Sequence, residues 1–453
     1  MASLTYMQLL RGNRSFRWLW SGQVVSELGN WFNFIAGLGL IRSVSAAAPE
    51  ATAIMLVALL APFALFAPLA GAFADRWSRR TVMIAADLGR AVIALGYLLV
   101  KGPEDLWIAY VCAVVGSLLS CFFEAAKNAA MPNVTSADGL LAGNALMFSS
   151  RFLLMSLGAA LGGWASARFG YQTAFVINAA SFLVSAYSVW KIPAGAMREE
   201  PVDEAGKTRA RGEGAEAVKR ASYWADVREG WKYIARYPLV AAIIGINVLW
   251  ATGGGACNLI YDRLGGVAFA GQGGLEPDAA VAVLYASVGA GAFVGMFFAR
   301  RVGYHVELHG LTVRFIGWML FAHGVIFALA GLMPKLWMTG ALLFLSRFIV
   351  GMEFAVQDTL LQRLVPDQLR GRVITTDRAS EILVMTVSTV IAAWSLHLIN
   401  VRTLAVISGL LSATPGLIWL ALFAAGKLSM PAKPGPKPER QEDEKEALLA
   451  SAG

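Results

Sequence analysis

Residues 51–80 read ATAIMLVALLAPFALFAPLAGAFADRWSRR. The first 23 of them contain no charged side chain, whereas the last seven contain four. The hydrocarbon core of a bilayer is about 30 Å thick, so a helix needs roughly 20 apolar residues to cross it. The segment therefore predicts a membrane-spanning helix that ends at a charged loop. The charged residues of that loop are Asp75, Arg76, Arg79 and Arg80.

The composition of the whole chain also indicates a membrane protein. Of the 453 residues, 57% are hydrophobic and 15% are charged, whereas a soluble domain carries about 25% charged residues. Only helices or closed barrels satisfy their backbone hydrogen bonds in lipid. Barrel strands alternate in polarity over segments of about 10 residues. Because the apolar blocks here are longer and uniformly apolar, they predict helices.

Twelve such blocks predict an all-α membrane protein with twelve transmembrane helices in two pseudo-symmetric six-helix lobes. A faint repeat between 71–76 and 295–300, at the ends of the second and eighth blocks, supports two similar halves. The expected domains are a first lobe at 1–192, a linker at 193–236, a second lobe at 237–426 and a tail at 427–453. The predicted spans are 17–41, 51–73, 81–100, 105–126, 140–167, 171–191, 238–262, 279–299, 310–331, 335–358, 373–397 and 401–425.

The positions of Lys and Arg predict the orientation. The even-numbered loops are basic, with Lys127 counted in one of them and ten Lys or Arg from Lys191 to Arg236. The odd-numbered loops carry about one each, such as Arg42 and Arg263. Basic loops stay on the cytoplasmic side. We therefore expect both termini in the cytoplasm, and we interpret the net charge of +8 as this orientation signal rather than as a nucleic-acid surface.

The sequence lacks the motifs that would predict a metal site, a nucleotide site or an enzyme active site. The three cysteines form no CxxC motif or Cys/His cluster, so neither a disulfide framework nor a metal site is predicted. No Walker motif or catalytic triad is present, so we expect no cofactor, no ATP-driven cycle and no enzyme activity. His323 is expected to be a packed residue, and the glycines at 253–255 a break inside the seventh span.

The stretch from Gly71 to Arg80 resembles the loop 2–3 signature of the major facilitator superfamily, which has Gly, then Asp-Arg, then a basic pair at this spacing. The segments 16–23, 26–29, 86–91 and 371–373 resemble one branch of it, the bacterial exporters related to the enterobactin exporter and macrolide efflux proteins. The resemblance covers nearly the whole chain. It implies a two-lobed transporter fold.

Two departures from the family pattern weaken the expectation of antiport. Asn30 stands where the first helix often has a titratable Asp. In the fifth span, Ala159 replaces the proline of the antiporter signature, whose Gly-rich frame is otherwise present. The glycines still predict close helix packing. They are Gly158, Gly162 and Gly163.

Polar residues inside a span are costly, so they are candidates for function. Glu27 is estimated near the midplane of the first span, on one face with Gln23 and Asn30, while Ser26 and Asn33 lie beside that face. This stripe predicts the wall of a substrate cavity, with Glu27 as a candidate proton carrier. The alternative is that Glu27 only ties helices together.

The other charged residues inside the spans are expected either to take part in transport or to stabilise the helix packing. Arg151 and Arg347 are expected near the midplane of the fifth and tenth spans, where they face substrate or a carboxylate. Asp87 and Arg90 are one turn apart, which favours a structural or gating pair over substrate contact. Glu124 and Glu353 are expected near the cytoplasmic ends of the fourth and tenth spans, as gates or as snorkelling charges.

The loop signature implies a conformational latch at the cytoplasmic seam. By the resemblance, Gly71 allows close helix approach, and Asp75 meets the positive end of a helix in the other lobe. Arg76, Arg79 and Arg80 would then pair with acids there and stabilise the outward-facing state. The candidate partners on the eleventh span are Asp377, Arg378 and Glu381.

These observations support one hypothesis and two rivals. The hypothesis is a secondary active transporter of a bacterial inner membrane that carries out proton-coupled efflux of a small amphipathic or hydrophobic organic molecule, such as a drug, siderophore or metabolite. The expected partners are that substrate, protons and membrane lipids, without nucleic acid, and the chain is expected to act as a monomer. The rivals are a lipid or lysophospholipid transporter or importer, and a non-transporting membrane receptor or scaffold.

Overall fold

The computed structural model describes residues 6–135, 139–197 and 231–428; the side chains of residues 67, 68, 72, 74–76, 141, 367 and 368 are outside that description. The described residues form helices and contain no strand. The first lobe consists of α1 (Tyr6–Gly12), α2 (Arg14–Val44), α3 (Pro49–Arg76), α4 (Arg79–Gly96), α5 (Leu106–Val134), α6 (Leu140–Phe169) and α7 (Tyr171–Trp190). The second lobe consists of α10 (Pro238–Gly254), α11 (Cys257–Arg263), α12 (Pro277–Leu308), α13 (Thr312–Leu332), α14 (Leu336–Leu364), α15 (Asp367–Ser395) and α16 (Val401–Ala424).

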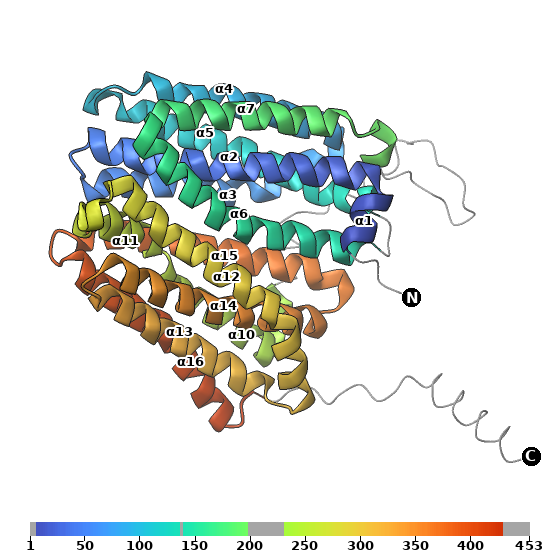
Figure 1. Ribbon diagram of the computed structural model, residues 1–453. Coiled ribbons are helices and arrows are strands. Elements are labelled where there is room, and N and C mark those ends of the chain that lie inside the picture. Colours follow the sequence, from blue (N-terminus) through green and yellow to red (C-terminus); the bar gives the residue numbers. More distant parts are fainter. Residues whose placement is uncertain (1–5, 136–138, 198–230, 429–453) are drawn as a thin grey trace, which may run out of the picture.

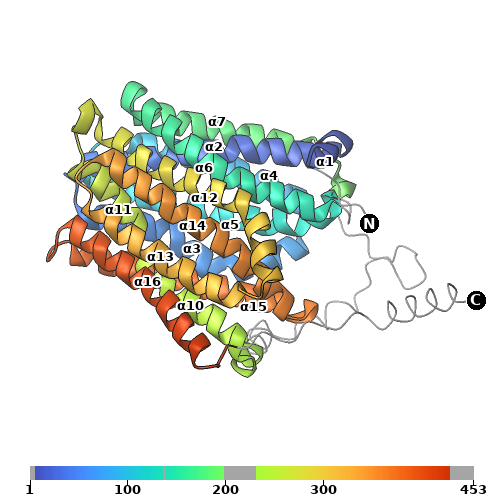
Figure 2. The same cartoon turned by 60° about the horizontal axis from the view of Figure 1, so that its bottom comes forward.

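Figure 1 shows the two lobes as two groups of roughly parallel helices, α2–α7 and α10–α16, and Figure 2 shows the same bundle after a rotation. Short helical turns connect the long helices. We call the end of the bundle that holds the turn after Val44 the distal end, and the end that holds α1 the proximal end. The turns are η1 (Tyr97–Leu99), η2 (Pro103–Asp105), η3 (Ala194–Met197), η4 (Leu264–Ala268) and η5 (Gln272–Gly274).

The local sequence explains where several helices begin. The side chain of Asn13 accepts a hydrogen bond from the backbone N–H of Phe16 at 2.8 Å and caps α2. Proline occupies the first turn of α3, α10 and α12, where its missing N–H costs nothing. These signals place helix starts at the proximal or distal ends, outside the apolar blocks.

The predicted fold class is confirmed. Among the described residues, eleven helical segments are long and apolar enough to cross a membrane. One of them, Pro238–Ala268, joins α10, α11 and η4 across the break predicted at the glycines 253–255. The remaining predicted span is α15, which has 29 residues but a polar first half. Most of the predicted linker and tail lies outside the described residues.

Several helices extend beyond their predicted ends. α5 continues to Val134 and α14 to Leu364, whereas hydropathy placed these ends at 126 and 358. The helical hydrogen bonds continue through polar residues that end an apolar block. Glu124 and Glu353 therefore lie two to three turns inside their helices rather than near the helix ends, which corrects the prediction.

The lobes meet mainly along α6 against α12 and α3 against α15. One hydrophobic cluster crosses this seam in the distal half, with Ile35 and Leu38 from α2 packed among Leu259, Leu284 and Tyr285 of the second lobe. Tyr285 also contacts the rings of two first-lobe residues, with centroid distances of 6.0 Å and 5.3 Å. Those two residues are Trp31 and Phe34.

Candidate functional site between the lobes

Helix α2 presents two faces to its own lobe. A Cβ atom at Gly22 would lie 2.8 Å from Cβ of Ser188, and one at Gly29 would lie 2.1 Å from Oγ of Ser181. One face of α2 is therefore pressed against α7. Gln23 and Glu27 follow Gly22 and the buried Ser26 by one position, so they are rotated toward α5 and α6, where they contact Lys127 and Arg151.

A cluster of charged and polar side chains occupies that second face. Lys127 donates hydrogen bonds from Nζ to Glu124 at 2.5 Å and to Gln23 at 3.3 Å. Arg151 Nε lies 3.6 Å from Oε1 of Glu27. We call these five residues the first-lobe cluster. It contains two acids and two bases, so its formal charge is balanced.

The first-lobe cluster is partly exposed. The side chain of Arg151 is 66% exposed, although it lies near the middle of α6, and that of Glu27 is 26% exposed. Among the described residues, Nε2 of Gln23 and Oδ1 of Asn33 have no hydrogen-bond partner. Asn30 is half-buried on the same helix. The side chains of Arg151 and Glu27 are therefore accessible to substrate or water.

The second lobe contributes a separate polar group. Arg347 donates hydrogen bonds to the Tyr261 hydroxyl at 2.8 Å and to Sγ of Cys257 at 3.3 Å. Tyr261 packs edge-on against Tyr285, with ring centroids 5.3 Å apart. Arg347 is thus held by its own lobe, on the far side of the aromatic cluster that seals the seam.

An ion-pair cluster joins the two lobes at the distal end. Arg42 of α2 pairs with both Asp262 of α11 and Asp278 of α12, and Thr52 of α3 donates to Asp262 at 3.3 Å. The side chains of Arg42, Asp262 and Asp278 are 7%, 0% and 10% exposed. We call these three residues the distal clamp. It binds the lobes through buried charges.

The other polar contacts described between the lobes also lie from the middle to the distal end. Ser156 of α6 donates to the backbone carbonyl of Ala286 in α12 at 2.9 Å. His397 and Glu50 form a more exposed pair at the distal rim. Nearer the proximal end, the rings of Phe148 and Phe354 stack with centroids 6.2 Å apart. The described conformation is therefore closed at its distal end by polar contacts.

The predicted latch residues are not brought together by the described contacts. The side chains of Asp75 and Arg76 lie outside the described part of the chain. The described partners of the others lie within their own half: Arg79 bonds to the carbonyl of Met197 and Arg80 to that of Trp190, Asp377 accepts from Asn247, and Arg378 pairs with Glu381 and Asp358. A Cβ atom at Gly71 would meet nothing within 4 Å, so no close helix approach occurs there in this conformation.

Two further predicted residues form a buried ion pair inside the first lobe. Arg90 pairs with Asp87, and its guanidinium lies 4.4 Å from the ring centroids of both Phe123 and Phe182. The side chains of Asp87 and Arg90 are 0% and 5% exposed. Because α4, α5 and α7 enclose the pair, it has no access to the seam.

The glycines of α6 form tight contacts on two sides. A Cβ atom at Gly158 would lie 2.7 Å from Trp31, and one at Gly162 would lie 3.0 Å from the backbone of Phe32 in α2. A Cβ atom at Gly163 would lie 2.2 Å from Cβ of Ala282 in α12. Gly163 therefore sets the distance between the lobes at the distal half of the seam.

Substituting Gly163 by Val should shift the protein away from the distal-closed conformation. Overpacking typically costs about 1–3 kcal/mol, and here the cost falls only on the conformation that brings α6 against α12. Spin labels at Lys101 and Glu276, on opposite lobes of the distal face, should report a longer distance by electron paramagnetic resonance. Gly245→Val is the control, because a Cβ atom at Gly245 would meet nothing within 4 Å. An unchanged distance in Gly163→Val would contradict this role.

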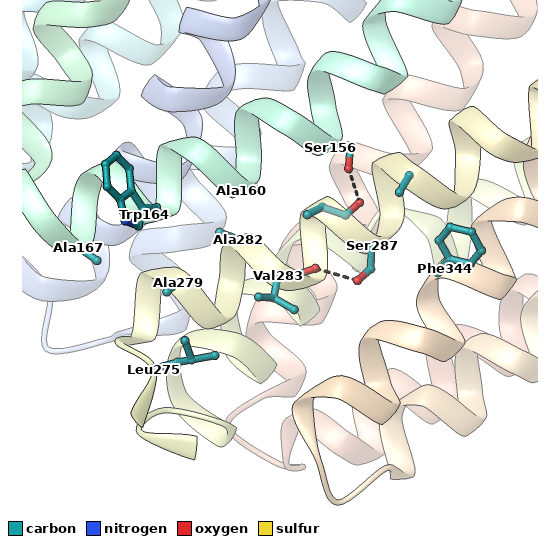
Figure 3. Close-up of a pocket in the computed structure, with 12 residues that line it drawn as sticks. Ser156, Ala160, Trp164, Ala167, Leu275, Ala279, Ala282, Val283, Ser287 and Phe344 are labelled. Carbon is teal, nitrogen blue, oxygen red and sulfur yellow. Dashed lines mark hydrogen bonds between the residues drawn. The ribbon is translucent and has the colours of Figure 1, made fainter. Parts of the chain in front are cut away.

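A groove lies on the outside of the seam, between α6 and α12 (Figure 3). Its volume is about 560 Å³. Small residues such as Ala160 and Ala279 form its floor, and Trp164, Val283 and Phe344 form its walls. An apolar groove of this kind suits a hydrocarbon chain.

Two lobes of spanning helices with charged groups at their seam define a membrane transport protein. Residues 19–373 match the Major Facilitator Superfamily, and the chain belongs to that family. It is a membrane transporter of the major facilitator type.

The relatives share the same class. The chain is 28% identical over 377 residues to an uncharacterized MFS-type transporter of Mycobacterium tuberculosis, Rv0037c, which covers 78% of each chain. It is 27% identical over 236 residues to YfiS, an uncharacterized MFS-type transporter of Bacillus subtilis, where the match spans about half of each, 51% of this chain and 52% of that protein.

Solved structures share the fold at low sequence identity. A bacterial homolog to the human lysosomal transporter Spinster, crystallised in an inward-facing and unoccupied conformation, has a TM-score of 0.65 at 14% identity, over 92% of this chain and 98% of that one. The nucleoside transporter NupG has a TM-score of 0.64 at 13% identity, over 90% and 99%.

Sequence reasoning missed the distal clamp and one member of the first-lobe cluster. Arg42 and Lys127 were interpreted as loop cations, but both lie inside helices and have partners. Asp262 was not singled out, although an acid near the end of an apolar span was a usable signal. Its partner was not predictable, because Arg42 lies 220 residues away in the chain.

Proposed function

We propose that this transporter exports a small amphipathic or hydrophobic organic molecule in exchange for protons, by alternating access between the two lobes. The observation that carries the proposal is the Glu27–Arg151 pair, partly exposed near the middle of the first lobe. A carboxylate beside an arginine can exchange its partner for a proton, since either one neutralises it. Movement of Arg151 would then accompany loading and release of the proton.

The proposed orientation places the distal end at the outer face of a bacterial inner membrane and both termini in the cytoplasm. The distal clamp then corresponds to an outer gate, closed while the substrate site communicates with the cytoplasm. The predicted latch of Asp75, Arg76 and Arg79 with the α15 acids would form in the opposite conformation. Asp377 and Arg378 contact residues of their own lobe, as expected if the latch is open in this conformation.

A second candidate function is transport of a lipid or lysophospholipid. The groove between α6 and α12 favours it, because this groove is lined by apolar and small residues and could take an acyl chain from the side. The balanced charges of the first-lobe cluster would also suit a zwitterionic headgroup. This candidate and the first share one fold and one cycle, and they differ in the substrate.

A reconstituted system tests both candidates. In proteoliposomes with an imposed pH gradient, we expect movement of an amphipathic dye, ethidium or anilinonaphthalene sulfonate, that collapses when the gradient is dissipated. Liposomes with a fluorescent lysophospholipid test the alternative under the same conditions. Movement of the lysolipid alone would replace the first proposal by the second. Movement of none of the probes, from protein shown to be folded, would contradict both.

A further inference from the structure

A carboxyl group without a partner lies in the core of the second lobe. Glu353 of α14 is 2% exposed, and its Oε1 atom has no hydrogen-bond partner. It lies eleven residues before the end of α14 at Leu364, about 16 Å along the helix. The ion pairs described in this part of the lobe involve other carboxylates, at Asp358 and Glu381.

Among the described residues, no cation pairs with Glu353. α10 has no charged residue between Pro238 and Gly254. His323 of α13 is buried and shares a hydrogen bond of 2.6 Å with Oγ of Ser346. The charged and titratable groups on the elements packed around α14 are Asp278, Tyr285, Arg300, Arg301, Tyr304, His305 and Glu307 of α12, Arg314 and His323 of α13, and Asp367, Arg370, Arg372, Asp377, Arg378 and Glu381 of α15, with Arg347, Asp358 and Arg363 on α14 itself.

Burial without a partner determines the charge of this group. An isolated carboxylate in a low-dielectric interior costs so much free energy that the group takes up a proton instead. Glu353 is therefore neutral in the distal-closed conformation. It can ionise only if a movement of the surrounding helices brings water or a cation to it.

A hydrogen-bonded bridge connects the turn of Glu353 to the seam. Gln357, one helical turn further on, donates to Oδ1 of Asn247 in α10 at 2.8 Å. Asn247 in turn donates to both carboxylate oxygens of Asp377 in α15, at 3.1 Å each. Because α15 packs against α3 of the first lobe, relative motion of the lobes acts on one end of this bridge.

We infer that Glu353 is a proton-binding site of the second lobe, coupled to the movement of the lobes through Gln357, Asn247 and Asp377. It would act besides Glu27, so that each lobe would contribute one carboxyl group to proton coupling. The proton binds to Glu353 as the second lobe encloses it and leaves when the α14–α15 contact opens. This inference rests on the proposed proton-coupled transport.

Infrared difference spectroscopy of the full-length protein in lipid tests proton binding without requiring transport. At neutral pH, wild type minus Glu353→Gln should show the carbonyl stretch of a protonated carboxyl group, and wild type minus Glu276→Gln should not, because Glu276 is exposed. Glu353→Met, which also removes the group, should give the same band and guards against a folding defect of one variant. If the band is absent from the difference spectra of both Glu353 variants, the inference is overturned. It is also overturned if adding sodium ions at constant pH removes the band.

Transport gives the second readout. In proteoliposomes that move a dye, Glu353→Gln should lower gradient-driven transport at least about tenfold and leave dye counterflow nearly unchanged, because a permanently neutral group allows exchange but not coupling. Normal gradient-driven transport by Glu353→Gln would overturn the coupling role while leaving the proposed function intact. If no dye moves in wild type, the proposed function fails, and the infrared band still decides whether Glu353 binds a proton.

Discussion

Replacing Arg42 by Gln is expected to open the distal face of the transporter. The change leaves Asp262 and Asp278 buried without their cation, and removal of one partner from a buried ion pair typically costs about 3–5 kcal/mol. This cost falls on the distal-closed conformation, since the clamp must separate when the lobes part there. Each 1.4 kcal/mol corresponds to about tenfold in an equilibrium constant, so the closed conformation should lose its dominance.

Cysteine accessibility measures the effect. Ala53 of α3 is 4% exposed within the cluster that crosses the seam, and an Ala53→Cys reporter in a background with the three native cysteines changed to Ser should react slowly with a membrane-impermeant maleimide. Arg42→Gln should accelerate this reaction at least about tenfold, the equivalent of 1.4 kcal/mol. Lys101→Met removes an exposed distal cation and should have no effect.

A triple variant separates charge from packing. Combining Arg42→Gln with Asp262→Asn and Asp278→Asn removes all three charges, so no buried charge is left without its partner, which is the main cost of the single substitution. We expect this variant to restore much of the slow reaction at residue 53. An unchanged reaction rate in Arg42→Gln alone would show that the apolar contacts keep the distal end closed without the clamp.

The sequence predicted the helices because their cause is local. A block of apolar residues such as 51–73 needs no partner to identify it, since lipid imposes the same requirement on every span. The helix ends were less predictable, because α5 and α14 continue through polar residues until Val134 and Leu364. α15 shows the same limit, since hydropathy finds its apolar half only.

The residues of the candidate site could be predicted from the sequence, but the partner of each charged residue could not. Depth alone placed Glu27 and Arg151 near the midplane, and the structure sets them 3.6 Å apart. By contrast, the estimated depth in the membrane could not distinguish the environments of Glu124 and Glu353. Glu124 has a lysine partner, whereas Glu353 has no partner among the described residues. The partner of a charged residue depends on which helices pack together, and this information is not in the local sequence.

Glu27→Gln is expected to abolish transport driven by a pH gradient. The substitution retains the size and most of the hydrogen-bonding capacity of the side chain and removes its charge, so Arg151 loses the carboxylate that lies 3.6 Å away. Without the Glu27 carboxyl group, the first-lobe cluster can bind substrate but lacks the group proposed to exchange a proton for it. Gradient-driven accumulation of dye should fall at least about tenfold, while counterflow stays measurable, because exchange needs the alternating movement but no net proton transfer.

The matched control is Glu104→Gln, an acid-to-amide change at an exposed distal turn that should leave transport and its pH dependence intact. Arg151→Gln provides an independent test of the pair, since it removes the guanidinium that lies 3.6 Å from Glu27. Both variants should change the pH profile of transport relative to wild type. If Glu27→Gln still concentrates dye with the wild-type pH profile, Glu27 is a structural partner of Arg151, and the coupling carboxyl group lies elsewhere in the protein.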